Sequence, residues 1–251
     1  MEVVTRLNVG KRFGSKTILF GYPTTQTEFD EMFRLRYDVY SRRGYIEPSR
    51  FPDKQEKDEF DKDNRTRYFI AQIEGGRIIG TVRLIIKDQL PTEEYFLFKE
   101  PAKISEVPRS KRGELGRFII IPPDKAKGEY LPRNLVMLFI TDLLADYGIA
   151  HDIAGGYVFI KSSLNEKFKK LRAPFHVVTP YKQHYPENGV LLPYFTQPDD
   201  PVMPAYFLTK ECKKFANRLL RASLMFKIER TGDFMLKSNL YTSFLRMIHV
   251  I

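Results

Sequence analysis

One arginine shares the apolar face of a predicted helix. Arg36 lies three residues after Phe33 and four before Tyr40, so its guanidinium is on the side of the helix that packs inward. A buried guanidinium is costly unless a carboxylate or a substrate anion meets it. Arg36 is therefore either a residue that binds an anion in a site or an arginine whose charged end reaches the edge of the helix.

A dense group of carboxylates follows in a loop predicted over residues 45–65. Within EKDEFDKD, Glu56, Asp58 and Asp61 have the spacing E-x-D-x-x-D. Carboxylates this close repel one another, so the pKa of some of them should rise, or arginines or a cationic ligand should hold them. The spacing does not match a calcium loop, which needs more oxygen ligands and a central glycine. The alternative interpretation is a solvated charged loop.

Two predicted strands each carry an arginine among apolar residues. In the strand over 77–87, Arg83 alternates onto a face whose other members are mostly apolar. In ELGRFIII, Glu114 and Arg117 are three residues apart and would point to opposite faces of a regular strand. A bulge at Gly116 would bring them to one face and kink the strand. A structural ion pair is the alternative.

The elements that would position these residues form a mixed α/β order. We predict strands over 16–21, 66–74, 77–87, 114–121, 156–161 and 175–179, and helices over 25–44, 134–147 and 163–172. The pair Gly75-Gly76 predicts a hairpin turn between two of the strands. From residue 209 to the end we expect two amphipathic helices. We therefore expect one α/β domain over residues 1–190, with a C-terminal helical extension over residues 191–251 packed on it.

Composition excludes several classes of protein. The 251 residues are 43% hydrophobic and 14% aromatic, which excludes a disordered chain. No apolar run is long enough to span a bilayer, and without a secretory core near the N-terminus we expect a cytoplasmic protein. The single cysteine, Cys212, allows no internal disulfide, and no two of the four histidines have a metal-ligand spacing. The net charge of +10 predicts an acidic partner.

Taken together, four motifs resemble the autoinducer synthases that make acyl-homoserine lactones. They are LRYDVY at 35–40, EKDEFD at 56–61, GTVRLI at 80–85 and ELGRF at 114–118. The segments SRFPDKQEKDEFD, RLRYDVY and PTEEYF resemble still more closely the exosortase-associated acyltransferases and N-acyl amino acid synthases of that superfamily. The resemblance covers about residues 15–180. It implies the GNAT acyltransferase fold, a twisted and mostly antiparallel sheet splayed between its fourth and fifth strands.

The resemblance also implies amide formation from a fatty acyl thioester on acyl carrier protein. By position, it assigns catalysis to Glu56, Glu114 and Arg117. Mutual repulsion among the acids would raise the pKa of one carboxylate, which makes Glu56 the candidate base, and a water relay is the alternative. It assigns substrate binding to Arg36, Tyr40, Tyr45, Asp58, Asp61, Arg83, Phe118, Ile119, Lys161 and Ser162. We expect backbone N–H groups near Phe118 and Ile119 to meet the oxyanion. Summed charges put the polar site near −1, which suits an acceptor of net charge 0 or +1.

The donor and the acceptor are predicted by class. The basic excess favours acidic acyl carrier protein as donor, and a coenzyme A phosphate loop is not recognisable. Candidates for binding the donor phosphate or the carrier protein are Lys125, Lys127, Arg133, Lys167 and Lys170. The acceptor amine belongs to an amino acid or to S-adenosylmethionine. The lactone synthases carry a tryptophan shortly after the first helix, and its absence from this chain argues against S-adenosylmethionine. We expect no bound cofactor and no metal.

Three alternatives stay open beside this interpretation. The same fold could bind acyl lipids or an effector without turnover, or could act as a coenzyme A-dependent N-acetyltransferase. A nucleic-acid-binding protein would explain the charge of +10. It has no recognition-helix or aromatic-basic sheet signature here, however, and leaves the acidic loop unexplained.

Overall fold

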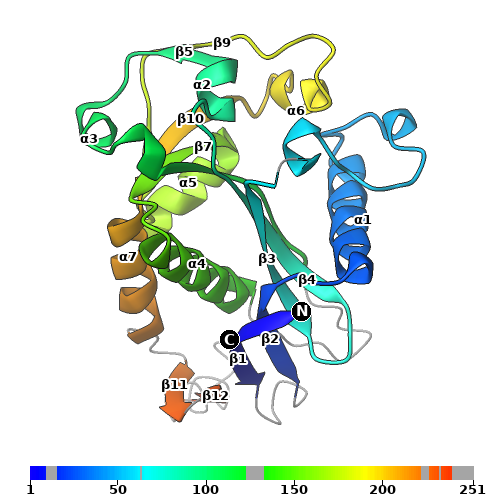
Figure 1. Cartoon of the computed structure of the whole chain (residues 1–251), viewed down its shortest axis with the longest axis vertical. Coiled ribbons are helices and arrows are strands. Elements are labelled where there is room, and N and C mark those ends of the chain that lie inside the picture. Colours follow the sequence, from blue (N-terminus) through cyan, green and yellow to red (C-terminus); the bar gives the residue numbers. More distant parts are fainter. Residues whose placement is uncertain (10–15, 63, 123–132, 222–225, 232, 239–251) are drawn as a thin grey trace, which may run out of the picture.

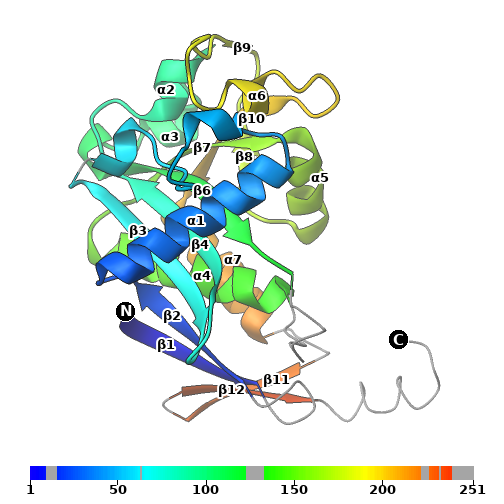
Figure 2. The same ribbon diagram turned by 90° about the vertical axis from the view of Figure 1, so that its right-hand side faces the viewer.

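The computed structural model describes residues 1–9, 16–62, 64–122, 133–221, 226–231 and 233–238. Its main sheet has the strand order β11-β12-β1-β2-β3-β4-β6-β7-β10-β8 (Figures 1 and 2). These strands are β1 (Glu2–Val9), β2 (Thr17–Tyr22), β3 (Thr66–Ile73), β4 (Ile78–Ile85), β6 (Arg112–Ile120), β7 (Gly155–Lys161), β8 (His176–Val177), β10 (Val202–Leu208), β11 (Phe226–Thr231) and β12 (Asp233–Ser238). The helices are α1 (Gln26–Arg42), α2 (Pro91–Tyr95), α3 (Ala102–Ser105), α4 (Arg133–Ala150), α5 (Ser162–Leu171), α6 (Leu192–Phe195) and α7 (Thr209–Arg221). Among these helices, none is long and apolar enough to cross a membrane.

The sheet opens between β6 and β7. These neighbours run parallel and pair only over Arg112–Leu115 and Gly155–Val158, although both strands continue beyond that point. A Cβ atom on Gly156 would lie 1.6 Å from the carbonyl oxygen of Gly113, so glycine is needed where the strands still touch. Counted from β2, β6 and β7 are the fourth and fifth strands, so the predicted splay is confirmed.

Helices cover the sheet on both faces. Figure 1 shows α1 on one face and α4 with α7 on the other. The largest core cluster lies between the sheet and α4, where Phe20 stacks on Phe139 with ring centroids 5.1 Å apart. A near-continuous apolar sequence in α4 (LVMLFI) is consistent with this burial.

An aromatic cap lies over the open end of the sheet. β5 (Phe96–Phe98) pairs with β9 (Tyr181–Gln183), and α2 and α6 lie beside this small sheet (Figure 1). Rings from both sequence regions pack together; Tyr95, for example, packs edge-on against Tyr185 with ring centroids 4.7 Å apart. We call residues 184–201 the strap, because this segment crosses from β9 back to β10.

The C-terminal part differs from the sequence prediction. The first predicted helix is present as α7, but β11 and β12 follow it where the second was expected, and the rest of that prediction, over 239–251, lies outside the described residues. The segments of β11 and β12, FKIERT and DFMLKS, are too short and too alternating to continue a helical pattern. β1, which the sequence reading also missed, pairs in parallel with β12. The domain division at residue 190 stays a prediction, and β10, which lies beyond it, pairs with β7 inside the main sheet.

Candidate active site

Helix α1 carries a buried arginine to two carboxylates of the acidic loop. The helix begins at the N-cap Thr25, which forms a capping box with Glu28 and so fixes the start of the helical register. Arg36 is fully buried and donates through Nε to Glu56 at 2.6 Å. Its two terminal nitrogens donate to Asp61 at 2.9 and 2.8 Å. The alternative of an edge arginine is thus excluded.

Two strand arginines complete a closed network of three cations and three anions. Arg83 of β4 donates to both oxygens of Asp58, at 2.6 and 2.9 Å. Arg117 of β6 donates to Glu56 at 2.8 Å and to Asp58 at 2.7 Å. Both arginines are at most 5% exposed. The acidic loop is therefore a buried structural partner of the arginines, and the solvated-loop alternative is wrong.

The predicted bulge in β6 is present, and its distorted residue is Arg117 rather than Gly116. The β4–β6 pairing passes from Arg83 opposite Gly116 to Thr81 opposite Ile119, which leaves an extra residue in β6. Arg117 has φ of +56°, a left-handed conformation that costs a non-glycine residue about 1–2 kcal/mol. Its ion pairs with the acidic loop offset this cost. The bulge turns Arg117 towards the α1 face of the sheet.

Of the two expectations for the acidic loop, the structure bears out the one in which arginines hold the carboxylates, and the pKa shifts run opposite to the direction that favoured Glu56 as a base. Burial raises the pKa of Glu56, but the charges of Arg117 and Arg36 outweigh it, and the net pKa is lowered. The pKa of Asp61 is likewise lowered, because Arg36 and Arg83 outweigh its burial. A carboxylate with a depressed pKa is a poor proton acceptor. The reasoning that made Glu56 a base, mutual repulsion among the acids, is therefore corrected.

Glu114 is the carboxyl group whose pKa rises. Burial raises its pKa to about 8, against a hydrogen bond from the backbone N–H of Thr92 at 2.7 Å. Glu114 is thus mainly neutral at pH 7, and three arginines balance the three remaining acids, so the site has a charge near zero rather than −1. Among the described contacts, none joins Glu114 to Arg117, so the alternative of a structural ion pair between them is not supported.

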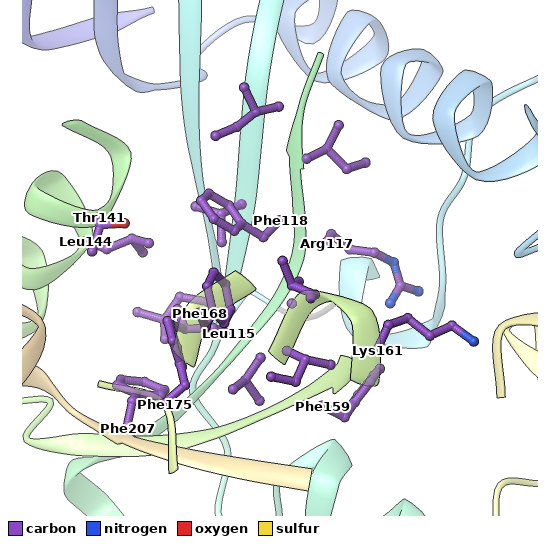
Figure 3. A pocket seen from close by; sticks show the side chains of 18 of the residues that line it. Leu115, Arg117, Phe118, Thr141, Leu144, Phe159, Lys161, Phe168, Phe175 and Phe207 are labelled. Carbon is purple, nitrogen blue, oxygen red and sulfur yellow. The ribbon is translucent and has the colours of Figure 1, made fainter. Parts of the chain in front are cut away.

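A cavity of about 270 Å³ passes through the sheet where β6 and β7 separate (Figure 3). On the α4–α5–α7 side its wall is apolar and includes Leu144, Phe168 and Phe207. Leu115 and Phe118, on either side of the bulge, face this side of the strand in Figure 3. This part of the cavity, the apolar arm, has the shape and chemistry to hold a hydrocarbon chain.

The opposite side of the cavity is aromatic and basic. Tyr40, Tyr45 and Tyr194 line it together with Arg117 and Lys161. Figure 3 shows the charged ends of Arg117 and Lys161 on the same side, away from Leu144. We call this aromatic and basic side of the cavity the polar arm. Over the whole described cavity wall, the charged residues are all cations, namely Arg43, Arg117, Lys161 and Lys167.

Other predicted site residues are placed less centrally. Phe118, Ile119 and Lys167 line the cavity, whereas Ser162 donates to the carboxylate of Asp200 at 3.1 Å. Lys170 is exposed on α5. Lys125 and Lys127 lie outside the described residues, and Arg133 begins α4 with a side chain outside them.

The sequence reading missed the contribution of the strap. Tyr194 lines the polar arm, and its ring packs edge-on against Tyr45 at 4.9 Å. Asp200 accepts hydrogen bonds from Ser162 and Ser163 at the start of α5. The only sequence signal was the richness of residues 180–208 in proline and aromatic side chains.

The fold defines the class of protein. The structure is similar to that of FeeM, an N-acyl amino acid synthase from uncultured soil microbes, with a TM-score of 0.53 and 15% identity over 80% of this chain and 94% of that one. It is also similar to the acyl-homoserine lactone synthase LasI, with a TM-score of 0.51 and 17% identity over 76% and 89% of the two chains. The fold is therefore that of the autoinducer synthases.

A family model narrows the class. The model of the N-acyl amino acid synthase FeeM matches residues 31–153, which contain Arg36, the acidic loop, Arg83, Glu114 and Arg117. The chain is an acyltransferase, similar over residues 31–153 to the N-acyl amino acid synthases and in fold to the autoinducer synthases. A search of curated proteins finds no match to the chain.

Proposed function

We propose that this enzyme moves a fatty acyl group from the thioester of acyl carrier protein to the α-amine of an amino acid. The observation that carries the proposal is the cavity through the sheet, whose apolar arm and polar arm meet at the bulge of β6. A fatty acyl chain fits the first arm and a polar amine the second. The thioester would then lie in the gap between β6 and β7.

The reaction needs no covalent enzyme intermediate. The amine nitrogen attacks the thioester carbonyl, a C–N bond forms, and the C–S bond breaks to release the thiol of the donor. Backbone N–H groups near Phe118 and Ile119 would stabilise the oxyanion, since these residues line the cavity beside the bulge. The network of Arg36, Glu56 and Arg117 holds the bulged strand in this position.

The amine must lose its proton before it attacks. A free α-amino group titrates near ~8, and nearby cations lower that pKa by disfavouring the ammonium form. Glu56 and Asp58 neutralise Arg117 without lining the cavity, so it is the remaining cations of the described wall, among them Lys161, that favour the neutral amine. We infer that water carries the proton away, and that Glu56 acts as a positioning residue rather than as the base.

The same charges favour an amino acid over S-adenosylmethionine. Both acceptors carry a carboxylate and an ammonium, but S-adenosylmethionine adds a sulfonium cation. That cation would enter a chamber whose described charged residues are cations, at an electrostatic cost. Acyl carrier protein suits the net charge of +10 and the exposed lysines of α5, among them Lys167, which also lines the cavity.

The test is a crossed assay of donors and acceptors. Purified enzyme is incubated with medium- and long-chain acyl groups on carrier protein or on coenzyme A. One arm contains the twenty amino acids and the other S-adenosylmethionine, with products read by mass spectrometry. Carrier protein without an acyl group is the control. We expect N-acyl amino acids from acyl carrier protein; lactones, products from acyl-coenzyme A alone, or ligand binding without product would refute the proposal.

A further inference from the structure

Lys161 is a buried lysine at the end of β7, just beyond the point where this strand leaves β6. Strand alternation places it on the same face as Phe159, which packs in the aromatic cap, whereas Ile160 faces the opposite cluster with Phe168. Lys161 is 3% exposed and lines the polar arm of the cavity. Its ammonium lies 4.5 Å from the ring centre of Tyr194 and 5.6 Å from that of Tyr45.

The described contacts of this ammonium are incomplete. It donates to two main-chain carbonyl oxygens of the strap, those of Tyr194 and Asp200. An ammonium has three N–H donors, so one is left for a further acceptor. The charge of the Asp200 carboxylate, which accepts hydrogen bonds from Ser162 and Ser163, acts on Lys161, but no described ion pair or hydrogen bond joins the two side chains. A buried ammonium that has a donor left and no carboxylate in direct contact is suited to a ligand that brings one.

We propose that Lys161 binds the α-carboxylate of the acceptor amino acid and thereby selects for acceptors that carry one. The proposal rests on the proposed function and names the residue that recognises one end of the acceptor. With the carboxylate on Lys161, the neighbouring amine stays within the polar arm, on the same side as Arg117. The rings of Tyr45 and Tyr194 flank the same spot and exclude water from the ion pair.

A purely structural role is the alternative. Lys161 could serve only to tie the strap to β7 through its two carbonyl contacts. A structural tie would affect every acceptor equally, whereas carboxylate recognition affects only acceptors that carry the charge. The two roles therefore differ in one measurable ratio, the kcat/KM for an amino acid divided by that for its carboxamide.

The experiment compares this ratio in wild-type enzyme and in Lys161→Met. The acceptor pair is the best amino acid of the crossed assay and the same amino acid with its carboxylate converted to carboxamide. We expect Lys161→Met to lower kcat/KM for the amino acid about tenfold to hundredfold, mainly through KM, and for the carboxamide less than about threefold. Lys161→Gln, which keeps hydrogen-bond donors for the strap but removes the charge, should shift the ratio in the same direction.

A matched control loosens the strap elsewhere. Arg50 is exposed, does not line the cavity, and donates to the strap carbonyls of Gly189 at 3.1 Å and Asn188 at 2.8 Å. We expect Arg50→Ala to leave the ratio unchanged. An equal loss with both acceptors in both Lys161 variants, or an unchanged ratio, would overturn the proposal.

The outcomes also separate this proposal from the proposed function. If wild-type enzyme makes N-acyl amino acids and the ratio does not respond to Lys161, only the assignment of Lys161 fails. If wild-type enzyme accepts no amino acid at all, the proposed function fails and this assignment fails with it.

Discussion

Replacing Arg36 with methionine should destabilise the enzyme strongly. Arg36 is fully buried and supplies three hydrogen bonds, one to Glu56 and two to Asp61, at 2.6–2.9 Å. Removing one partner of a buried ion pair costs about 3–5 kcal/mol, because the other charge is left uncompensated. Arg36 serves two carboxylates, each of which keeps one other arginine, so we expect a loss within this range.

The pH dependence of that loss has a definite sign. In wild-type enzyme, folding lowers the pKa values of Glu56 and Asp61. Their contribution to stability is therefore fully present when the pH is above the pKa values of the unfolded state, and it is lost as the pH falls through the pKa values of the folded state. In Arg36→Met the two carboxylates lose a cation, and their pKa values should rise. Mild acid then protonates these carboxylates and removes their unpaired buried charge. The loss of unfolding free energy relative to wild type should therefore shrink between pH 7 and pH 5.

Urea unfolding followed by far-ultraviolet circular dichroism measures both effects. Arg42→Met is the matched control, because Arg42 is an exposed arginine in the last turn of the same helix, and it should change the free energy of unfolding by less than about 0.5 kcal/mol. A loss below about 1 kcal/mol for Arg36→Met at pH 7, or a deficit that is the same at pH 5, would refute the reasoning.

Two further predictions concern Glu114 and the apolar arm. The folded-state pKa of Glu114 is about 8, above the ordinary 4.5, so its contribution is present below pH 4.5 and lost as pH rises through 8. Glu114→Gln should remove this loss and be more stable than wild type at pH 9 by about 4–5 kcal/mol in urea unfolding; parallel pH profiles would contradict it. Leu144→Trp should shift the preferred donor to shorter acyl chains, with kcat/KM falling about fourfold for each methylene displaced from the arm. Ile149→Trp, on the same helix but 53% exposed, should leave the chain-length profile unchanged, and a shift in that control would contradict the assignment.

Much of the polar network could be predicted because local patterns carried it. Helical spacing placed Arg36 inward, and strand alternation did the same for Arg83. The bulge was predictable because Glu114 and Arg117 are spaced unevenly around a glycine. The prediction put the distorted residue at Gly116, one position before Arg117. The ion pairs that stabilise Arg117 in the left-handed conformation join segments about sixty residues apart, so local spacing could not identify it.

The remaining parts of the site depend on contacts that leave no periodic signal. The strap contributes Tyr194 and Asp200, but its sequence repeats with neither a helical nor a strand period. The pKa pattern was missed for a related reason. Counting acids predicted repulsion, whereas the fold places two arginines against each of Glu56, Asp58 and Asp61, and no described ion pair joins Glu114 to an arginine.

The passage of the cavity through the sheet has a consequence for how the product leaves. With the acyl chain in the apolar arm and the acceptor in the polar arm, the new amide would join a head group on one face to a tail on the other. The pairing of β6 with β7 up to Leu115 and Val158 blocks sideways release at that end of the gap. The product would withdraw lengthwise, drawing its chain back through the opening, so departure becomes slower as the chain grows longer, whatever the speed of the chemical step.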